Sequence, residues 1–274
     1  MNYKYIPFIN KGIMQTIELP NNLMPSATII IPAYNEEERI GKVLEETTDF
    51  VDANNLNWNI IVSVDGNDGT DMVVLSYAAK YPFVFLNKKG GRSGKGEAIR
   101  RAMMNATGDI SIIMDADGSI SLRDVVENVR YIGSYDMVIF DRYSNRENHI
   151  PLFRRIPSRG YNLLVRSIFG IKVNDTQCGY IIVRSGIGRE SFSRVRMTNG
   201  FFYVPLLYYV RKLGGKIKEI PIKYVYDGKS KFKVSGMVIG GAVSLLAFRL
   251  RHSRFYKYVP HWATELYLKK FRWI

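Results

Sequence analysis

The sequence predicts an α/β fold, a doubly wound and mostly parallel sheet with a C-terminal amphipathic, membrane-associating segment. Three observations predict it. Apolar, β-branched runs alternate with helical patterns for about 115 residues from position 27. Acid-rich turns follow these runs, at the strand ends where parallel sheets bind ligands. Residues 211–274 hold 15 of the 39 Lys and Arg but 3 of the 25 Asp and Glu, which indicates a polyanionic partner there.

Each element is predicted from apolar periodicity and from the residues that bound it. Residues 1–26, with three prolines, predict an irregular lead-in, and Thr70 is expected to cap a helix. The predicted strands are Ala27–Ile31, Asn59–Val64, Phe83–Leu86, Ile110–Met114 and Met137–Phe140. One predicted helix begins at Asn35. The others span Thr70–Ala79, Glu97–Asn105 and Leu122–Ile132. Further on we expect helices over Arg155–Phe169 and Gly200–Leu213, a short strand within Asn174–Val183 and a strand-like stretch over Lys216–Val225.

The composition excludes several classes of protein. A chain of 274 residues, 46% hydrophobic, is long enough to bury a sizeable core. One cysteine excludes an internal disulfide, and with three histidines it cannot build a Cys/His zinc site. Met1–Phe8 does not have the pattern of a signal peptide. The apolar run Val234–Phe248 would span about 22 Å as a helix, short of the roughly 30 Å of a bilayer core. We therefore expect association with the cytoplasmic face of a membrane.

The strongest chemical motif is Met114-Asp115-Ala116-Asp117-Gly118-Ser119. Two carboxylates two positions apart directly follow a buried apolar strand. At a strand end, this spacing lets one carboxylate reach a ribose and the other a hard cation. Mg²⁺ or Mn²⁺ would take few protein carboxylates and complete its shell with phosphate oxygens. An Asp-rich turn with a purely structural role is the alternative interpretation.

Four motifs together resemble the nucleotide-sugar-binding half of the family 2 glycosyltransferases, which have the Rossmann-like GT-A fold. They are Pro32-Ala33-Tyr34-Asn35-Glu36, Val64-Asp65-Gly66, Gly94-Lys95-Gly96 and the Asp115–Asp117 motif. The resemblance implies that Pro32, Ala33, Tyr34, Glu36 and Asp65 surround the nucleoside. It further implies that Lys95 lies near the phosphates, and that Asp115 and Asp117 bind the diphosphate through a divalent metal, with Asp117 catalytic.

A later motif narrows the resemblance. Asn174-Asp175-Thr176-Gln177-Cys178-Gly179-Tyr180 looks like the Asp-Thr-Gln-Cys-Gly-Phe motif of dolichyl-phosphate β-glucosyltransferases. Lys218–Ile222 and Gly228–Lys231 are shared with dolichyl-phosphate mannose synthases as well. Asp175 is then expected to shape the acceptor pocket or assist transfer, with an Asx-turn as the alternative. Arg142, Arg155 and Arg159 are expected to bind the acceptor phosphate through their forked guanidinium groups, or to form a solvated helix face.

Two departures from the family pattern bear on mechanism. The turn after Val64 is one residue shorter and lacks the first aspartate of the usual Asp-Asp pair. Phe202-Tyr203-Val204-Pro205-Leu206 stands where the resembling enzymes have Phe-Asp-Val-Glu-Leu, so both acids are lost. A phosphate acceptor, whose second pKa is about 6, is already a nucleophilic dianion at neutral pH. The loss therefore argues against a hydroxyl acceptor more than against a phosphate acceptor.

The sequence thus predicts an inverting, metal-assisted transfer of a hexose to a polyprenyl or dolichyl phosphate. UDP-glucose is the first expected donor and GDP-mannose the second. A family 2 enzyme with a soluble sugar or glycan acceptor and a non-catalytic nucleotide-sugar binder are the alternatives. Nucleic acid is not expected as a partner, because no recognised binding motif supports it. The predicted organisation is a lead-in (1–26), a glycosyltransferase domain (27–233) and a basic, aromatic segment (234–274). The domain is expected to comprise a nucleotide-sugar half (27–142) and an acceptor half (143–233).

Overall fold

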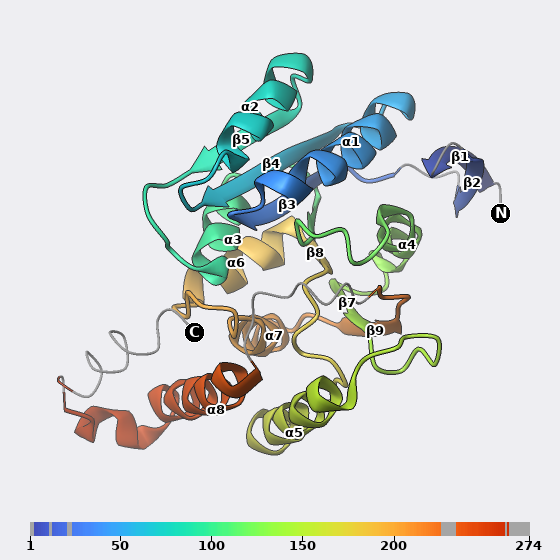
Figure 1. Cartoon of the computed structure of the whole chain (residues 1–274). Coiled ribbons are helices and arrows are strands. Elements are labelled where there is room, and N and C mark those ends of the chain that lie inside the picture. Colours follow the sequence, from blue (N-terminus) through green and yellow to red (C-terminus); the bar gives the residue numbers. More distant parts are fainter. Residues whose placement is uncertain (1–2, 11–12, 21–23, 226–233, 261, 263–274) are drawn as a thin grey trace.

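A seven-stranded sheet forms the centre of the protein, and helices cover both of its faces (Figure 1). The computed structural model describes residues 3–10, 13–20, 24–225, 234–260 and 262. The strand order is β5-β4-β3-β6-β8-β7-β9, and β8 is the one strand of this sheet that runs against the others. The strands are β3 (Ala27–Tyr34), β4 (Trp58–Asp65), β5 (Val84–Lys88), β6 (Ile110–Ile113), β7 (Met137–Asp141), β8 (Ile181–Arg184) and β9 (Ile217–Pro221). The predicted α/β class and mostly parallel sheet are confirmed.

The helices divide between two apolar cores, one on each face of the sheet. Along β3, Ile29 and Ile31 point into one core and Ile30 into the other, as expected for a strand buried on both faces. Helices α1 (Glu37–Ala53), α2 (Thr70–Lys80) and α4 (Leu122–Glu127) contribute to the first core. Helices α3 (Lys95–Met104), α5 (Leu152–Phe169), α6 (Ser185–Arg194), α7 (Tyr203–Lys212) and α8 (Val234–Arg251) contribute to the second. The sheet is therefore doubly wound, as predicted.

The lead-in is not irregular, which corrects the prediction for residues 1–26. Strands β1 (Tyr3–Asn10) and β2 (Ile13–Pro20) pair as an antiparallel hairpin outside the main sheet. The prolines in this stretch favour irregular structure. In a two-stranded ribbon every strand is an edge strand, however, and edge strands accommodate proline.

Further corrections follow from tertiary pairing. Strand β8 inserts antiparallel between β6 and β7, and the helix α6 that follows it was not predicted. The helix predicted over Leu122–Ile132 ends at Glu127 and continues as a 3₁₀ turn, η1 (Asn128–Tyr131). Gly69 rather than Thr70 occupies the N-cap of α2. Local periodicity does not report any of these outcomes, because a strand's direction and a helix's last turn depend on what packs against them.

Helix α8 packs beside α5 on the side of the sheet that carries α7 (Figure 1). Gly241 lies against the Tyr161 ring, and the Phe169 and Phe248 rings are 5.3 Å apart. Within the described residues, no helix is long and apolar enough to cross a membrane. A second 3₁₀ turn, η2 (Arg254–Tyr258), follows α8. The Gly228–Lys231 motif and the basic residues beyond 262 lie outside the described part of the chain. The division into two halves stays a prediction, since one sheet takes strands from both.

Candidate active site

The polar motifs gather at the carboxyl ends of β3, β4 and β6. The chain runs from β3 outward through β4 to β5 and then returns to place β6 on the other side of β3. This reversal is a topological switch point between β3 and β6, and open α/β sheets bind their ligands beyond the strand ends at such a point. Tyr34 and Asp65 are register partners at the ends of β3 and β4, and Asp115 follows β6.

The turns after β3 and β4 are locked together. Asn35 has a positive φ of 54°, and its side-chain oxygen accepts the amide of Asn67 at 3.1 Å. The Glu36 amide donates to the Thr70 hydroxyl at 2.8 Å. Gly66, at φ 107°, leaves no room for a side chain because a Cβ there would lie 2.1 Å from the Asn35 oxygen. The Pro32–Glu36 and Asp65–Gly66 motifs therefore form one structural unit. Within it Pro32 and Ala33 are buried and Tyr34 is exposed.

Asp65 anchors the Gly90–Gly96 loop. It is buried, and its Oδ2 accepts the Ser93 amide at 2.8 Å and the Gly94 amide at 3.1 Å. The other oxygen is 3.1 Å from the Arg101 guanidinium. The loop held in this way carries Arg92, whose guanidinium lies 4.7 Å from the Tyr34 ring centre. Asp65 thus supports the wall of the expected nucleoside site through this loop.

Lys95 and Asp115 form an ion pair at the centre of the site. The Lys95 ammonium is 2.6 Å from Asp115 Oδ1, and it lies 5.6 Å from the centre of the Tyr203 ring. Burial alone lowers the pKa of the Lys95 ammonium, but the charge of Asp115, together with Tyr203 and the hydrogen bonds to both residues, outweighs burial and raises that pKa well above its usual value. The ammonium therefore stays protonated, next to the carboxylate expected to face the donor phosphates.

Asp117 is the more exposed carboxylate of the motif, and its Oδ1 accepts the Ser119 amide at 3.0 Å. Partial desolvation, reinforced by the like charge of Asp115, raises the pKa of Asp117. A bound cation would relieve both effects. Among the described residues no three His, Cys, Asp or Glu side chains cluster to hold a metal alone. The site therefore fits Mg²⁺ or Mn²⁺ held by Asp115 and Asp117 and completed by donor phosphate oxygens.

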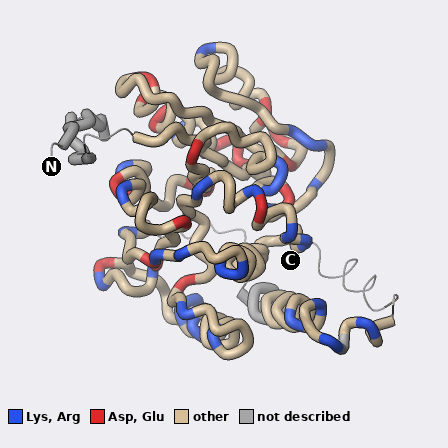
Figure 2. Tube along the Cα trace, turned by 180° about the vertical axis from the view of Figure 1, so that it is seen from behind, with Lys and Arg blue, Asp and Glu red and all other residues tan. Residues whose placement is uncertain are grey.

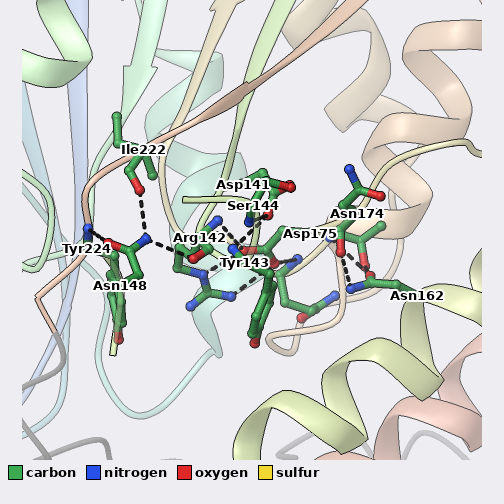
Figure 3. A network of polar contacts seen from close by, with 12 residues as sticks. Asp141, Arg142, Tyr143, Ser144, Asn148, Asn162, Asn174, Asp175, Ile222 and Tyr224 are labelled. Atoms are coloured by element: carbon green, nitrogen blue, oxygen red, sulfur yellow. Dashed lines mark hydrogen bonds and ion pairs between the residues drawn. The ribbon is translucent and has the colours of Figure 1, made fainter. Parts of the chain in front are cut away.

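Asp175 is paired with Arg142 (Figure 3). Arg142 Nε lies 2.7 Å from Asp175 Oδ2, and its Nη2 lies 3.0 Å from Oδ1, so the contact is bidentate. Asp175 is fully buried, and the Arg142 guanidinium lies near the rings of Tyr143 and Tyr224, at 5.6 and 5.4 Å. Although burial opposes it, the charge of Asp175 raises the pKa of Arg142 well above its usual value. The carboxylate thus fixes the orientation of the guanidinium.

Three further side chains hold this pair in place. Glu219 accepts the backbone amides of Asn174 and Asp175, at 2.7 and 3.0 Å. Asn162, on the inner side of α5, accepts the Thr176 amide and donates to the Asn174 carbonyl (Figure 3). Asn148 donates to the Arg142 and Ile222 carbonyls, both at 2.8 Å. This end of the site is therefore preorganised by contacts between segments far apart in the sequence.

The other two predicted phosphate ligands differ from each other. Arg155 donates to the Tyr143 carbonyl at 3.5 Å, and its Nε is buried without a hydrogen-bond partner. Arg159 is exposed on the outer side of α5. The structure thus brings Arg155, but not Arg159, to the segment that carries Arg142.

The segment Asp175–Tyr180 connects the two ends of the site. Asp175 holds Arg142, and four residues later Gly179 lies so close to Asp115 that a Cβ would be 1.9 Å from Oδ2. The buried Tyr180 hydroxyl accepts the Ile120 amide at 3.3 Å and donates to the Asp115 carbonyl at 3.5 Å. An expected metal-binding carboxylate and an expected phosphate-binding arginine are therefore positioned by one short loop.

Sequence reasoning missed several of these residues. Arg92, Arg101 and Ser93 act on the donor side through contacts that no local pattern reveals. Tyr203 stands where the resembling enzymes have an acid, and its ring lies near Lys95. Gly179 belongs to the Asn174–Tyr180 motif, and this motif was the one sequence signal for its importance. Its contact with Asp115 is visible only in the structure.

The fold and the comparisons with known proteins define a glycosyltransferase. The family model described as glycosyl transferase family 2 matches residues 28–192, and the chain belongs to this family. A dolichyl-phosphate beta-glucosyltransferase of Trichomonas vaginalis is 31% identical over 252 residues, covering 82% of this chain and 76% of that protein. The family resemblance predicted from the motifs is therefore confirmed.

Solved structures support the GT-A fold. Mannosyl-3-phosphoglycerate synthase from Rubrobacter xylanophilus matches with a TM-score of 0.63 and 17% identity, over 83% of this chain and 74% of that one. Glucosyl-3-phosphoglycerate synthase from Mycobacterium tuberculosis, in complex with Mn²⁺, UDP and its product, matches with a TM-score of 0.58 and 17% identity. This match covers 81% of this chain and 80% of the synthase.

Proposed function

We propose that this glycosyltransferase transfers glucose, with inversion, from UDP-glucose to a polyprenyl phosphate of the dolichyl type. The named activity of its relatives supports the acceptor class and the sugar. The observation that carries the proposal is the Asp175–Tyr180 loop. It contacts the donor-side carboxylate Asp115 through Gly179 and orients Arg142 through Asp175. This contact supports the proposal, because a reaction between a nucleotide sugar and a phosphate would need the proposed cation-binding residues and anion-binding residues close together.

On the donor side, Asp115 and Asp117 would hold the divalent metal. When bound, that ion supplies positive charge to the diphosphate that leaves with the uridine. Lys95 adds a second, permanent positive charge beside Asp115. Tyr34 and Arg92, on neighbouring turns, frame the nucleoside.

On the acceptor side, Arg142 binds and orients the lipid phosphate, with Arg155 next to it. Fixing two anions in line for reaction is the harder task here, and oriented guanidinium groups perform it. A phosphate oxygen attacks the anomeric carbon and forms the new C–O bond. The bond from that carbon to UDP breaks, and UDP leaves with the electron pair. No proton has to be removed, because the phosphate monoester is largely a dianion at neutral pH.

The replacement of both family acids in the segment 202–206 fits this chemistry. Tyr203 and Pro205 lie in the first turn of α7, both buried, and Pro205 is tolerated there because the first helical turn needs no amide donor. A general base typically accelerates a reaction by about 10²–10⁴-fold. A phosphate acceptor does not require this acceleration, because it is already deprotonated.

A turnover assay tests the proposal. Detergent-purified protein receives polyprenyl phosphate, Mn²⁺ and radiolabelled UDP-glucose or GDP-mannose in separate reactions, and label is followed into the organic phase. We expect label from UDP-glucose alone, abolished by Asp117→Ala. Label from GDP-mannose alone would reject the proposed sugar. Label transferred to a water-soluble acceptor but never to lipid would reject the proposed acceptor. Donor binding without any turnover would indicate a non-catalytic binder.

A further inference from the structure

The outer side of α5 is unusually apolar for an exposed helix face. Leu152, Ile156 and Leu163 are 69%, 67% and 63% exposed, and they follow one another at helical spacing along one stripe. Phe153 and Leu164 extend the stripe to one side. A helix on the surface of a soluble domain ordinarily presents polar residues outward. A contiguous exposed apolar face of this kind marks a contact surface.

The charged residues of the helices at this face have a single sign. Helix α5 contains four arginines and no acid, and α8 together with η2 contains basic residues and no acid. In Figure 2 the lower edge of the molecule, formed by α5 and α8, carries blue segments accordingly. Leu246 and Leu250 of α8 are also exposed. Apolar side chains bordered by arginines complement an anionic lipid surface, where they enter the headgroup layer.

The inner side of the same helix forms part of the acceptor site. Asn162 binds the backbone on both sides of Asp175, and Arg155 reaches the Tyr143 carbonyl next to Arg142. One helix therefore presents apolar side chains outward and supports the expected phosphate site inward. If the outer side of α5 contacts a membrane leaflet, a lipid phosphate in that leaflet would lie close to the expected phosphate site at Arg142.

We propose that the α5–α8 surface, defined by Leu152, Phe153, Ile156, Leu163 and Leu164 with Leu246 and Leu250, docks on an anionic membrane leaflet. The proposal rests on the proposed function for its biological purpose, and it adds a surface within the predicted glycosyltransferase domain to the expected membrane-associating segment 234–274. Helix α5, within the catalytic domain, is the principal contact. Docking there brings the acceptor phosphate to Arg142 without removing the lipid chain from the bilayer.

Vesicle binding by the full chain tests the surface. The variant Ile156→Glu/Leu163→Glu places two negative charges on the stripe. The control Met72→Glu/Leu75→Glu also replaces two exposed apolar residues by glutamate, but on α2, which precedes α5 by more than seventy residues. Cosedimentation is measured with phosphatidylcholine vesicles with and without phosphatidylserine. We expect the α5 variant to bind the mixed vesicles at least about tenfold more weakly, since burying one Leu or Ile side chain strengthens the binding constant by roughly tenfold to hundredfold. The control should match the unmodified protein.

Two further readouts keep the inference separate from the proposed function. UDP binding in the presence of Mn²⁺ should be unchanged in the α5 variant, which shows that the variant is folded. Vesicle binding does not require turnover, so a failure of lipid glucosylation in every variant would reject the proposed function and leave the surface intact. Equal vesicle binding by the α5 variant and the control would overturn the inference. So would a dimer of the unmodified protein that the α5 variant converts to monomer, because the face would then be an interface between copies.

Discussion

Replacing Gly179 with alanine tests whether the Asp175–Tyr180 loop positions the donor-side carboxylate. An added Cβ would lie 1.9 Å from Asp115 Oδ2, whereas real Cβ atoms essentially never approach a heavy atom closer than 3.0 Å. The carboxylate, or the loop, must therefore move by about 1.1 Å or more. Lys95 holds the other oxygen of Asp115 at 2.6 Å, so the movement also disturbs the ion pair.

A displacement of about 1 Å at a reacting centre can cost on the order of 10²-fold in rate. We expect Gly179→Ala to lower kcat/KM for UDP-glucose by about 100-fold, measured from initial rates of label transfer to polyprenyl phosphate. Gly186→Ala is the matched control, because a Cβ on that helical glycine meets no atom within 4 Å. The control should keep full activity and gain about 0.5–1 kcal/mol of stability. Activity of Gly179→Ala within threefold of the unmodified enzyme would refute the positioning argument.

Four other outcomes are expected. Tyr180→Phe leaves the buried Ile120 amide without its partner and should lower the free energy of unfolding by about 1–3 kcal/mol, measured by urea denaturation. Arg142→Lys keeps the charge but loses the bidentate contact with Asp175, so the KM for polyprenyl phosphate should rise about tenfold while UDP affinity stays constant. For Asp68, desolvation is outweighed by hydrogen bonds from Thr70 and from the amide of Glu37, and the pKa is lowered from 3.8. The unmodified protein should therefore lose stability relative to Asp68→Asn as the pH falls below 3.8, through the lowered pKa of Asp68. Parallel pH profiles of the two proteins in thermal unfolding would contradict the stabilising role of the Asp68 carboxylate. Chelation with EDTA should abolish transfer and added Mn²⁺ should restore it, whereas full activity in EDTA would reject metal assistance.

The motifs at the ends of β3, β4 and β6 were largely predictable because their information is local. The strands that precede Asp65 and Asp115 are continuous apolar runs followed by polar turns, and the structure has them at the expected positions. Parallel strands bring their carboxyl ends to one edge, so the meeting of these motifs followed from the pattern alone. The order of the motifs also sufficed to identify the family.

The pairings within the site could not be predicted in the same way. Arg142 and Asp175 are 33 residues apart, and Ser93 and Asp65 are 28 apart. Side-chain pairing over such separations depends on how the elements pack, which periodicity does not report. The short strand within Asn174–Val183 was predicted, but its antiparallel direction as β8 was not, because a four-residue apolar run has no direction of its own.

Analysis of the reaction product tests the central claim most directly. The enzyme is incubated with UDP-glucose, polyprenyl phosphate and Mn²⁺, and the lipid product is examined by mass spectrometry and by proton and phosphorus NMR. The account predicts one hexose per lipid phosphate, a phosphodiester to the anomeric carbon with β configuration, and one UDP released for each sugar transferred. An α-linked product, or glucose attached to anything other than the lipid phosphate, would contradict it.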